Sequence, residues 1–586
     1  MMAGQSHPDF LGAPSARSYR ELLDIGSLSR PYFHEDSKQA DSTALQYSLG
    51  SSCYINELAP ELLATTFLHV LDPMAAPHWE LFIWPSATLK STRKLIKLKQ
   101  VCRYWREICV NTPSLSNTVH DFRGSNSSII QEVIKCGTIS LNVCVDRYFP
   151  SPVTLPLFKS GGWRIHNLHL YFPEDRSFAF RLTAQPNNHG LAHESLEPLE
   201  LQHIHLCTDF PASALEHFTV SSSAIEGGPF YPTLFQDHAP QLKTLALRSS
   251  TWLPANMFIS LTHLYICLSF KRIRHVQPLR NSVWVLPRLL IFMAGCPNLE
   301  VVSLWNIFSA WTVLDGIPSI TLRRLERLEI GGAHQDVIKW LLKHITIPAD
   351  FAAVRISNVV CTSGGSELKV LLPLLPSIDP GTMHVRQTSN GLSVSITDSS
   401  SSIGVETVRS NPEAEIWTPT VWALWHLEGV QELYLIGTHE VVIEFFAGIY
   451  ELLKQLPLLS TLVYRDSAPP NLLFEYLSPP VNTTPNGPPC PHLSTLRICI
   501  PEGTTLDFPK LVAFTETRAR AGHPLHRVTL EFESHASDLH AEVEVLGTYV
   551  EFVELREYDT TSASMSLPVP ATCTLTSDAT GQLWGT

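Results

Sequence analysis

The chain has 586 residues, enough for about four globular domains of ~150 residues or for one long repeat array. Apolar residues make up 44% and charged residues 17%, which excludes a wholly disordered chain and allows a large core. The net charge of 42 − 55 = −13 argues against a general nucleic-acid-binding protein.

The chain carries no pattern of secretion or membrane insertion. No uninterrupted apolar run reaches the ~18 residues of a transmembrane helix, and the first residues lack a basic stretch followed by an apolar one. The 12 cysteines are scattered without a CxxC pair, which is typical of reduced thiols. We therefore expect an intracellular protein, in the cytoplasm, the nucleus or both, with no membrane partner.

Segment 51–120 shows two helical patterns, whereas the two ends of the chain lack periodicity. Residues 1–50 and 559–586 are rich in small and polar residues, so we expect both to be disordered. In 55–71, Pro60 suits a first helical turn, and an apolar residue recurs every fourth position from Leu63 to Leu71. In 95–109, apolar residues at steps of three and four predict one amphipathic helix that ends before Pro113.

These two helices, LAPELLATTFLHVL and LKQVCRYWREICVNTPSL, resemble an F-box. The 72–94 insertion between them is longer than the usual linker of that family. The resemblance implies docking on a Skp-family adaptor and, through it, on a cullin scaffold. It places Trp105 in the F-box core, and it places the adaptor contacts at Leu58, Pro60, Leu62, Leu63, Phe67, Leu98 and Val101.

The helix over 95–109 also belongs to a basic run. Seven basic residues and no acidic residue lie between Lys90 and Arg106. A solvated helix face is the main interpretation. Electrostatic attraction to the acidic adaptor family is the second, and a nucleic-acid contact is the least favoured.

The rest of the chain, 121–558, repeats the pattern apolar-x-x-apolar-x-apolar at intervals mostly near 26–41 residues. Several repeats follow helical patterns, which predicts strand–helix units stacked into a parallel sheet. We therefore expect an α/β protein, with the helical F-box module followed by an irregular leucine-rich-repeat-like solenoid. Segment 380–408 departs from the repeat and reads as an inserted hairpin around Ser389-Asn390-Gly391. The repeats begin at Ile165, Leu201, Leu242, Leu261, Leu299, Leu325, Phe351, Val430, Leu459, Leu493 and Leu525.

In such a solenoid, alternate strand residues point away from the core and line the concave face. These positions mix aromatic, charged and small polar residues, which favours a protein partner over a polyanion. The loops 397–404 and 479–491 are the alternative binding surface. The predicted substrate-binding residues on the concave face are Tyr265, Arg327, Glu329, Tyr434 and Arg497.

No nucleotide-binding, zinc-protease or serine-hydrolase motif occurs, so we name no catalytic, cofactor-binding or metal-binding residue. His203, His205 and Cys207 would share one face of a strand, but no fourth zinc ligand is near them, and solvent-facing histidines are the better interpretation. Trp305, Trp311, Trp422 and Trp425 are candidates for lining a ligand groove, although core packing is the commoner role of Trp.

The expected function is non-catalytic: a substrate-recognition subunit of an SCF-type ubiquitin ligase, in which the solenoid binds an unknown protein substrate. The alternatives are a leucine-rich-repeat scaffold outside the ubiquitin system and an enzyme hidden in the solenoid. Co-purification with a Skp-family adaptor would distinguish the ligase subunit from the scaffold. Bound metal or converging titratable groups would favour the enzyme.

Overall fold

The structure is a computed structural model of the chain. The segments predicted to be disordered, 1–50 and 559–586, lie outside the residues that it describes. The described residues are 54–71, 86–115, 117–122, 140–146, 150–172, 199–221, 231–250, 252–268, 286–307, 319–361, 365–388, 391–409, 419–437, 443–465, 470–478, 489–500, 506–532 and 540–557.

The first described elements form a helical module with a core of its own. Leu63, Phe67 and Leu71 pack with Ile108, Cys109 and Leu115 in a cluster separate from the main core of the protein. Burial of these apolar side chains stabilises the module, since each contributes about 1.5–3 kcal/mol. The elements are η1 (Tyr54–Glu57), α2 (Pro60–Leu71), α3 (Ser86–Val101), α4 (Arg103–Asn111) and η3 (Pro113–Leu115).

The segment predicted as one helix over 95–109 is two helices, so that prediction was wrong. Cys102 interrupts the pattern with an extended backbone, φ −156° and ψ 171°. Its Sγ accepts a hydrogen bond from the backbone N–H of Trp105 at 3.4 Å and so caps α4. The apolar periodicity continues across the break, which is why the sequence pattern does not reveal it.

One sheet of 17 strands forms most of the described chain, and all of its pairings are parallel except β12–β13 and β13–β14. Two further strands, β8 (Ile320–Thr321) and β10 (Ile345–Thr346), pair separately. In the order in which neighbours pair, the strands of the sheet are β1 (Thr118–Phe122), β2 (Leu141–Asp146), β3 (Ile165–Tyr171), β4 (His217–Ser221), β5 (Thr244–Arg248), β6 (His263–Cys267), β7 (Val301–Trp305), β9 (Arg327–Gly331), β11 (Ala353–Cys361), β14 (Ser402–Arg409), β13 (Gly391–Thr397), β12 (Thr382–Thr388), β15 (Glu432–Ile436), β16 (Thr461–Arg465), β17 (Thr495–Ile500), β18 (Arg527–Phe532) and β19 (Phe552–Glu557).

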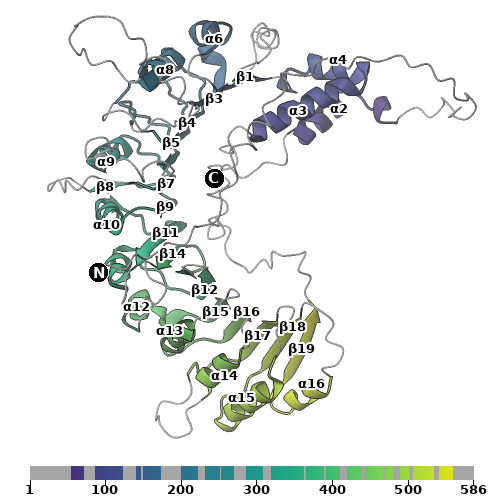
Figure 1. Cartoon of the computed structure of the whole chain (residues 1–586), viewed down its shortest axis with the longest axis vertical. Coiled ribbons are helices and arrows are strands. Elements are labelled where there is room, and N and C mark those ends of the chain that lie inside the picture. The colour runs from purple at the N-terminus through teal and green to yellow at the C-terminus, as the bar shows by residue number, and fades with distance from the viewer. Residues whose placement is uncertain are drawn as a thin grey trace, which may run out of the picture.

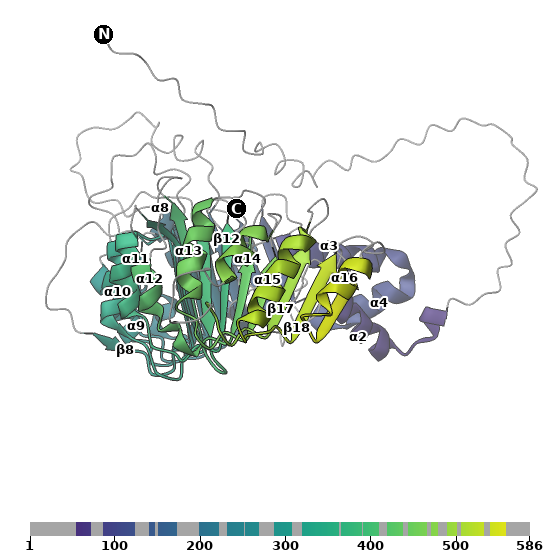
Figure 2. The same cartoon turned by 90° about the horizontal axis from the view of Figure 1, so that it is seen from below.

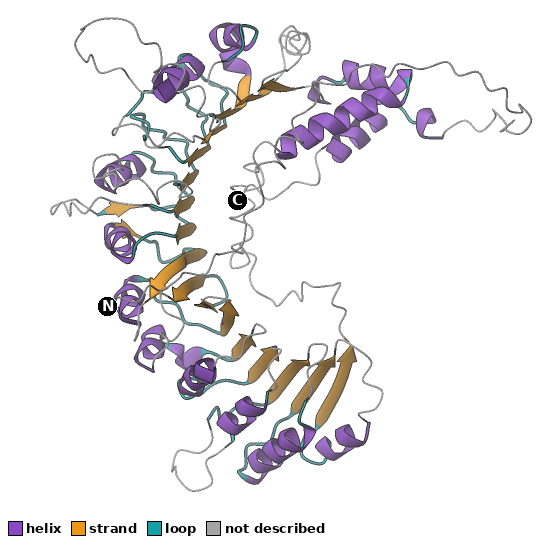
Figure 3. Cartoon of the chain, in the orientation of Figure 1, coloured by secondary structure: helices purple, strands orange, loops and turns teal. Residues whose placement is uncertain are grey.

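The sheet follows an arc, with the strands along its inside and the helices that connect them along its outside (Figures 1 and 3). The view from below shows α13, α14 and α15 as an outer layer over the last strands (Figure 2). The outer elements are α6 (Thr154–Gly161), η4 (Gly162–Arg164), α8 (Leu199–Thr208), η5 (Phe235–Asp237), α9 (Leu286–Ala294), α10 (Gln335–His344), α11 (Ser366–Leu371), η8 (Leu372–Leu374), α12 (Pro419–Trp422), η9 (Ala423–Trp425), η10 (Leu427–Gly429), α13 (Ile443–Leu453), α14 (Asn471–Leu477), α15 (Phe508–Arg520) and α16 (His540–Leu546).

The apolar repeat of the sequence explains this sheet. Every predicted repeat start except Leu201 leads into a strand, as Leu242 leads into β5. Within β5, Leu245 and Leu247 belong to the main core, whereas Ala246 lies on the opposite face. We call this opposite face of the sheet, which none of the described connecting helices covers, the inner face (Figure 1).

Leu201 is the exception, because the segment around it folds as helix α8 and not as a strand. His203, His205 and Cys207 therefore do not alternate on one strand face, and that prediction was wrong. His203 and Cys207 are one helical turn apart, and both are buried. Among the described residues, no group of three or more His, Cys, Asp or Glu side chains forms a metal site.

The hairpin predicted within 380–408 is confirmed by the antiparallel pairing of β12 with β13. A third strand, β14, pairs antiparallel with β13 and parallel with β11, so the three strands extend the sheet without an intervening helix. Of the predicted loop 397–404, only residues 398–401 form the turn; Thr397 belongs to β13, and 402–404 belong to β14. Most of the other predicted loop, 479–488, lies outside the described residues.

The separate core of the helical module leads to a first prediction. Trp105 is half-buried, and its ring lies 4.8 Å from that of Phe67. We expect Trp105→Ala to lower the free energy of opening of α2 by about 2–3 kcal/mol, because truncating a fully buried Trp costs about 3–5 kcal/mol. Hydrogen exchange of the α2 amides measures this free energy, and Val110→Ala, whose side chain is 62% exposed, is the matched control. Equal exchange in both variants would contradict the prediction.

Candidate functional site

The helical module exposes several large apolar side chains. Leu58 is 38% exposed, Leu62 57% and Val101 59%, although the module already has a buried core. Exposed apolar residues that gather on one small unit are typical of a binding surface. The other exposed apolar side chains of the module are Ile55, Leu68, Val70, Ile96 and Val110.

The predicted adaptor contacts divide into two groups. Leu58, Pro60, Leu62 and Val101 are exposed and Leu98 is half-buried, so these five remain available to a partner. Leu63 and Phe67 are 0% and 1% exposed, which corrects their assignment as contact residues. Both side chains pack in the core of the module, on the same helix as the exposed Leu62.

Side-chain hydrogen bonds fix the chain entry to α2. The Tyr104 hydroxyl on α4 donates to the backbone carbonyl of Leu58 at 3.1 Å. The Arg106 Nε donates to the carbonyl of Lys99 at 3.0 Å across the break at Cys102. These bonds hold the exposed apolar residues of α2, α3 and α4 in one rigid unit, which reduces the ordering cost of binding a partner.

The second candidate surface is the inner face of the sheet. The parallel register places Tyr265, Ser303, Glu329 and Arg355 side by side on the neighbouring strands β6, β7, β9 and β11. Of the predicted substrate-binding residues, Arg327 and Arg497 are half-buried, whereas Tyr265, Glu329 and Tyr434 are only 5–7% exposed. The prediction treated all five as open contacts, whereas only a small part of these three side chains is exposed.

Glu329 is a buried acidic group on this face. Its Oε2 accepts a hydrogen bond from the Ser303 Oγ at 3.1 Å. Burial raises the pKa of the Glu329 carboxyl. Arg355, the hydrogen bonds from Ser303 and the Trp305 indole, and Arg327 oppose this rise. The Trp305 indole lies over Gly331, where a Cβ atom would meet ring carbons at 2.6 Å, so glycine is required beside Glu329.

Arg497 is already engaged by the protein. Its Nε and Nη2 donate to the two carboxylate oxygens of Glu531 at 2.8 and 3.0 Å, in a bidentate pair. The Cys499 thiol donates to Glu531 Oε2 at 3.1 Å. Arg497 therefore offers a partner only the part of its guanidinium that Glu531 does not use.

His384 and Tyr434 form a stacked pair on β12 and β15. Their ring centroids are 4.5 Å apart with an interplanar angle of 12°. Burial lowers the pKa of His384 to about 4, so the imidazole is neutral at pH 7. The Tyr434 hydroxyl donates to Glu432 at 3.2 Å, and burial together with this carboxylate raises the pKa of the Tyr434 phenol to about 12.

Two inner-face residues that matter here, Arg355 and His384, were not predicted as site residues. Both strands were expected, but Arg355 follows a degenerate repeat at Phe351, and His384 lies in the segment set aside as an insertion. The period-2 alternation of HVRQT in β12 places His384 and Arg386 on one face, and that signal was available in the sequence.

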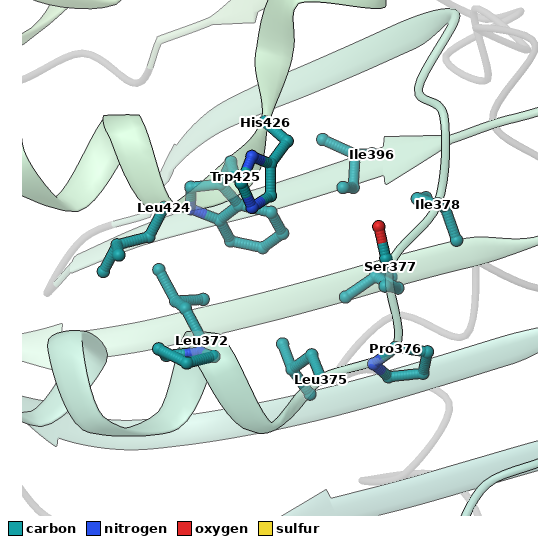
Figure 4. Close-up of a pocket in the computed structure, with 11 residues that line it drawn as sticks. Leu372, Leu375, Pro376, Ser377, Ile378, Ile396, Leu424, Trp425 and His426 are labelled. Atoms are coloured by element: carbon teal, nitrogen blue, oxygen red, sulfur yellow. The ribbon is translucent and has the colours of Figure 1, made fainter.

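A small pocket opens on the helix side of the insert (Figure 4). Its volume is about 170 Å³, and its lining is mainly aliphatic, with Ser377 and His426 as the polar contributors. Trp425 is among its lining residues, but Trp305, Trp422 and Trp425 are all buried, which agrees with the commoner role in core packing. Trp311 lies outside the described residues. The lining suits an apolar group and offers no constellation for catalysis. The labelled residues are Leu372, Leu375, Pro376, Ser377, Ile378, Ile396, Leu424, Trp425 and His426.

Comparison with known proteins adds no assignment: no protein-family model and no curated protein matches the chain. Within the described residues, no helix combines the length and the apolarity needed to cross a bilayer.

The buried histidines predict an acid-sensitive fold. Burial lowers the pKa of both His169 and His384 from 6.5 to about 4. Between these two pH values the unfolded chain binds protons that the folded chain does not, so the free energy of unfolding falls as the pH falls. Each histidine removes up to about 3 kcal/mol over this window, and its full contribution to stability is present above pH 6.5.

Urea unfolding at pH 7 and pH 4.5 measures this dependence. We expect His384→Phe to retain more of its stability at the lower pH than the unmodified chain does, because the substitution removes one group that must stay neutral. His492→Phe, at an exposed position, is the control. An identical loss of stability in the two variants would contradict the assignment of His384 as a buried neutral imidazole.

Proposed function

We propose that the protein is a substrate-recognition subunit of an SCF-type ubiquitin ligase. The observation that carries the proposal is the exposed apolar set Leu58, Leu62 and Val101 on a helical module with a separate core. These residues lie within the segments that resemble an F-box. In this proposal the module docks on a Skp-family adaptor, which links the chain to a cullin scaffold.

The charge of the module supports the same partner. Lys97, Arg103 and Arg106 are exposed beside the apolar residues, and only Arg103 has a carboxylate partner, Glu107 at 2.9 Å. Exposed basic residues around an apolar contact increase the association rate with an acidic partner. The adaptor family implied by the F-box resemblance is acidic.

The inner face of the sheet is the proposed substrate surface. Its side chains stand on paired strands, so little ordering is needed when a protein segment binds. The proposed role is proximity: the chain holds a substrate near a ubiquitin-charged enzyme and raises its effective concentration, and no residue of the chain takes part in bond formation.

A scaffold outside the ubiquitin system is the second candidate. It is favoured by the same inner face, because the sheet does not depend on the helical module for its core. The two functions differ in the partner of the helical module, which is what the next experiment measures. The described cysteines are all free thiols, which suits an intracellular setting for either function.

Docking of the helical module on the adaptor can be tested by replacing two of its exposed apolar residues with Asp. Leu62→Asp with Val101→Asp should abolish capture of a purified Skp-family adaptor by the whole chain, because each introduces a charge into an apolar interface. The fold should survive, since the two side chains are 57% and 59% exposed. Adaptor binding is read by calorimetry, and the thermal unfolding midpoint reports the fold.

Ile291→Asp is the matched control. Ile291 is 57% exposed on α9, in the sheet-bearing part of the chain. It should leave adaptor binding unchanged. If the unmodified chain does not bind the adaptor, the ligase proposal is wrong; if the double variant binds as well as the control, the docking surface is wrong.

A further inference from the structure

Among the described residues, a group of buried polar atoms on the inner face makes no hydrogen bond of good geometry. They are Glu329 Oε1, Arg355 Nη1, Ser357 Oγ and both ring nitrogens of His384. The Trp305 indole N–H, which also lacks such a bond, is the neighbouring donor of the Glu329 carboxylate, whose oxygens can accept further hydrogen bonds. Glu329 and His384 are each 5% exposed and Ser357 is 0% exposed. Buried polar atoms are almost always hydrogen-bonded, and leaving one unpaired destabilises the fold. Several such atoms on neighbouring strands indicate a site that is completed by a ligand.

The register shows how these groups are arranged. One row across the inner face runs from Glu329 through Arg355, Gly404 and Ser395 to His384. Gly404 and Ser395 are half-buried and small, so no large side chain stands between Arg355 and His384. Three strand spacings of ~4.8 Å separate these two residues, about 14 Å, which accommodates one extended peptide segment. We call the five residues of this row the central row.

The open hydrogen-bonding capacity is balanced between donors and acceptors. Glu329 Oε1 is an acceptor and Arg355 Nη1 is a donor, on adjacent strands. The neutral imidazole of His384 adds one donor and one acceptor. A carboxamide presents a C=O and an N–H at one end, so it can accept from Arg355 and donate to Glu329 together.

The charge around the row excludes ionic ligands. Arg327 and Arg355 accompany Glu329 and Glu406, and Arg355 Nη2 pairs with Glu406 at 3.5 Å. A phosphate or carboxylate would face two glutamates, and an ammonium group would face two arginines. A group that is uncharged and both donates and accepts avoids either repulsion.

We propose that the central row binds a protein segment through the side-chain carboxamide of an Asn or Gln residue. The inference rests on the inner face being the substrate surface in the proposed function. In the complex, Glu329 and Arg355 bind the carboxamide, and His384 bonds to a second amide of the same segment. The Tyr434 ring holds the imidazole in place by stacking.

The experiment uses the whole purified chain and a display library of random 12-residue peptides. We expect the selected peptides to share one position enriched in Asn or Gln. In a synthetic copy of a selected peptide, replacing that residue by Glu, Lys or Met should each weaken binding about tenfold or more, because a buried hydrogen-bond partner is then unmatched. No enrichment, or enrichment of acidic or basic residues, overturns the proposal.

Variants of the chain separate binding from folding. His384→Phe keeps the ring stack and removes two unpartnered polar atoms, so it should weaken the peptide about tenfold while the unfolding midpoint stays equal or rises. Glu329→Gln tests the acceptor in the same way. Thr495→Val, at a half-buried inner-face position on β17, is the matched control and should bind normally. A His384→Phe variant that binds the peptide as the control does would overturn the role of this row.

The result of the peptide experiment does not depend on adaptor binding. Adaptor binding is measured separately through Leu62 and Val101, which lie on the helical module. Failure of peptide selection with intact adaptor binding removes the carboxamide site and leaves the ligase proposal. Peptide binding without adaptor binding leaves the carboxamide site and removes the ligase proposal.

Discussion

The pairing of parallel strands across one continuous core is the constraint on which the rest of the structure depends. A strand such as β16 cannot bury its apolar side alone; Leu462 and Tyr464 are enclosed only because helices pack behind the sheet and neighbouring strands extend it. Each parallel connection needs a return segment, and the return segments occupy one face. The other face is left bare, and it is therefore the surface on which chemistry specific to this chain can accumulate.

The three strands β12, β13 and β14 depart from the pattern of parallel strands joined by helices. The pocket and part of the central row lie next to them. Two residues separate β12 from β13 in the sequence and four separate β13 from β14, so the sheet gains strands without gaining helices. On the helix side the shortfall leaves the apolar pocket between Ile396, Ile403 and Trp425. On the inner side the insert introduces Gly404 and Ser395 between Arg355 and His384. One departure from the repeat thus produces both a cavity and a row of unsatisfied polar groups.

The sequence predicted the strands well because their signal is local. A start such as Leu242 or Leu459 fixes three apolar positions, and the core keeps them buried. Leu201 shows the limit, because the same spacing of apolar residues also fits one face of a helix. The break at Cys102 depends on a thiol cap, and the enclosure of Tyr265 depends on neighbours distant in sequence. Such features are set by tertiary contacts, which periodicity does not encode.

The two cores divide the demands of binding between separate parts of the chain. Leu63 and Phe67 stabilise the core of the helical module, whereas Leu62 and Val101 are exposed and lie outside that core. On the inner face the reverse holds: Glu329 and His384 are buried yet contribute unpaired polar atoms, so the fold carries them at a cost. A sheet with so extensive an apolar core tolerates that cost. The helical module presents exposed apolar residues, and the inner face of the sheet presents unpaired polar groups. Two surfaces of such different chemistry suit two different partners.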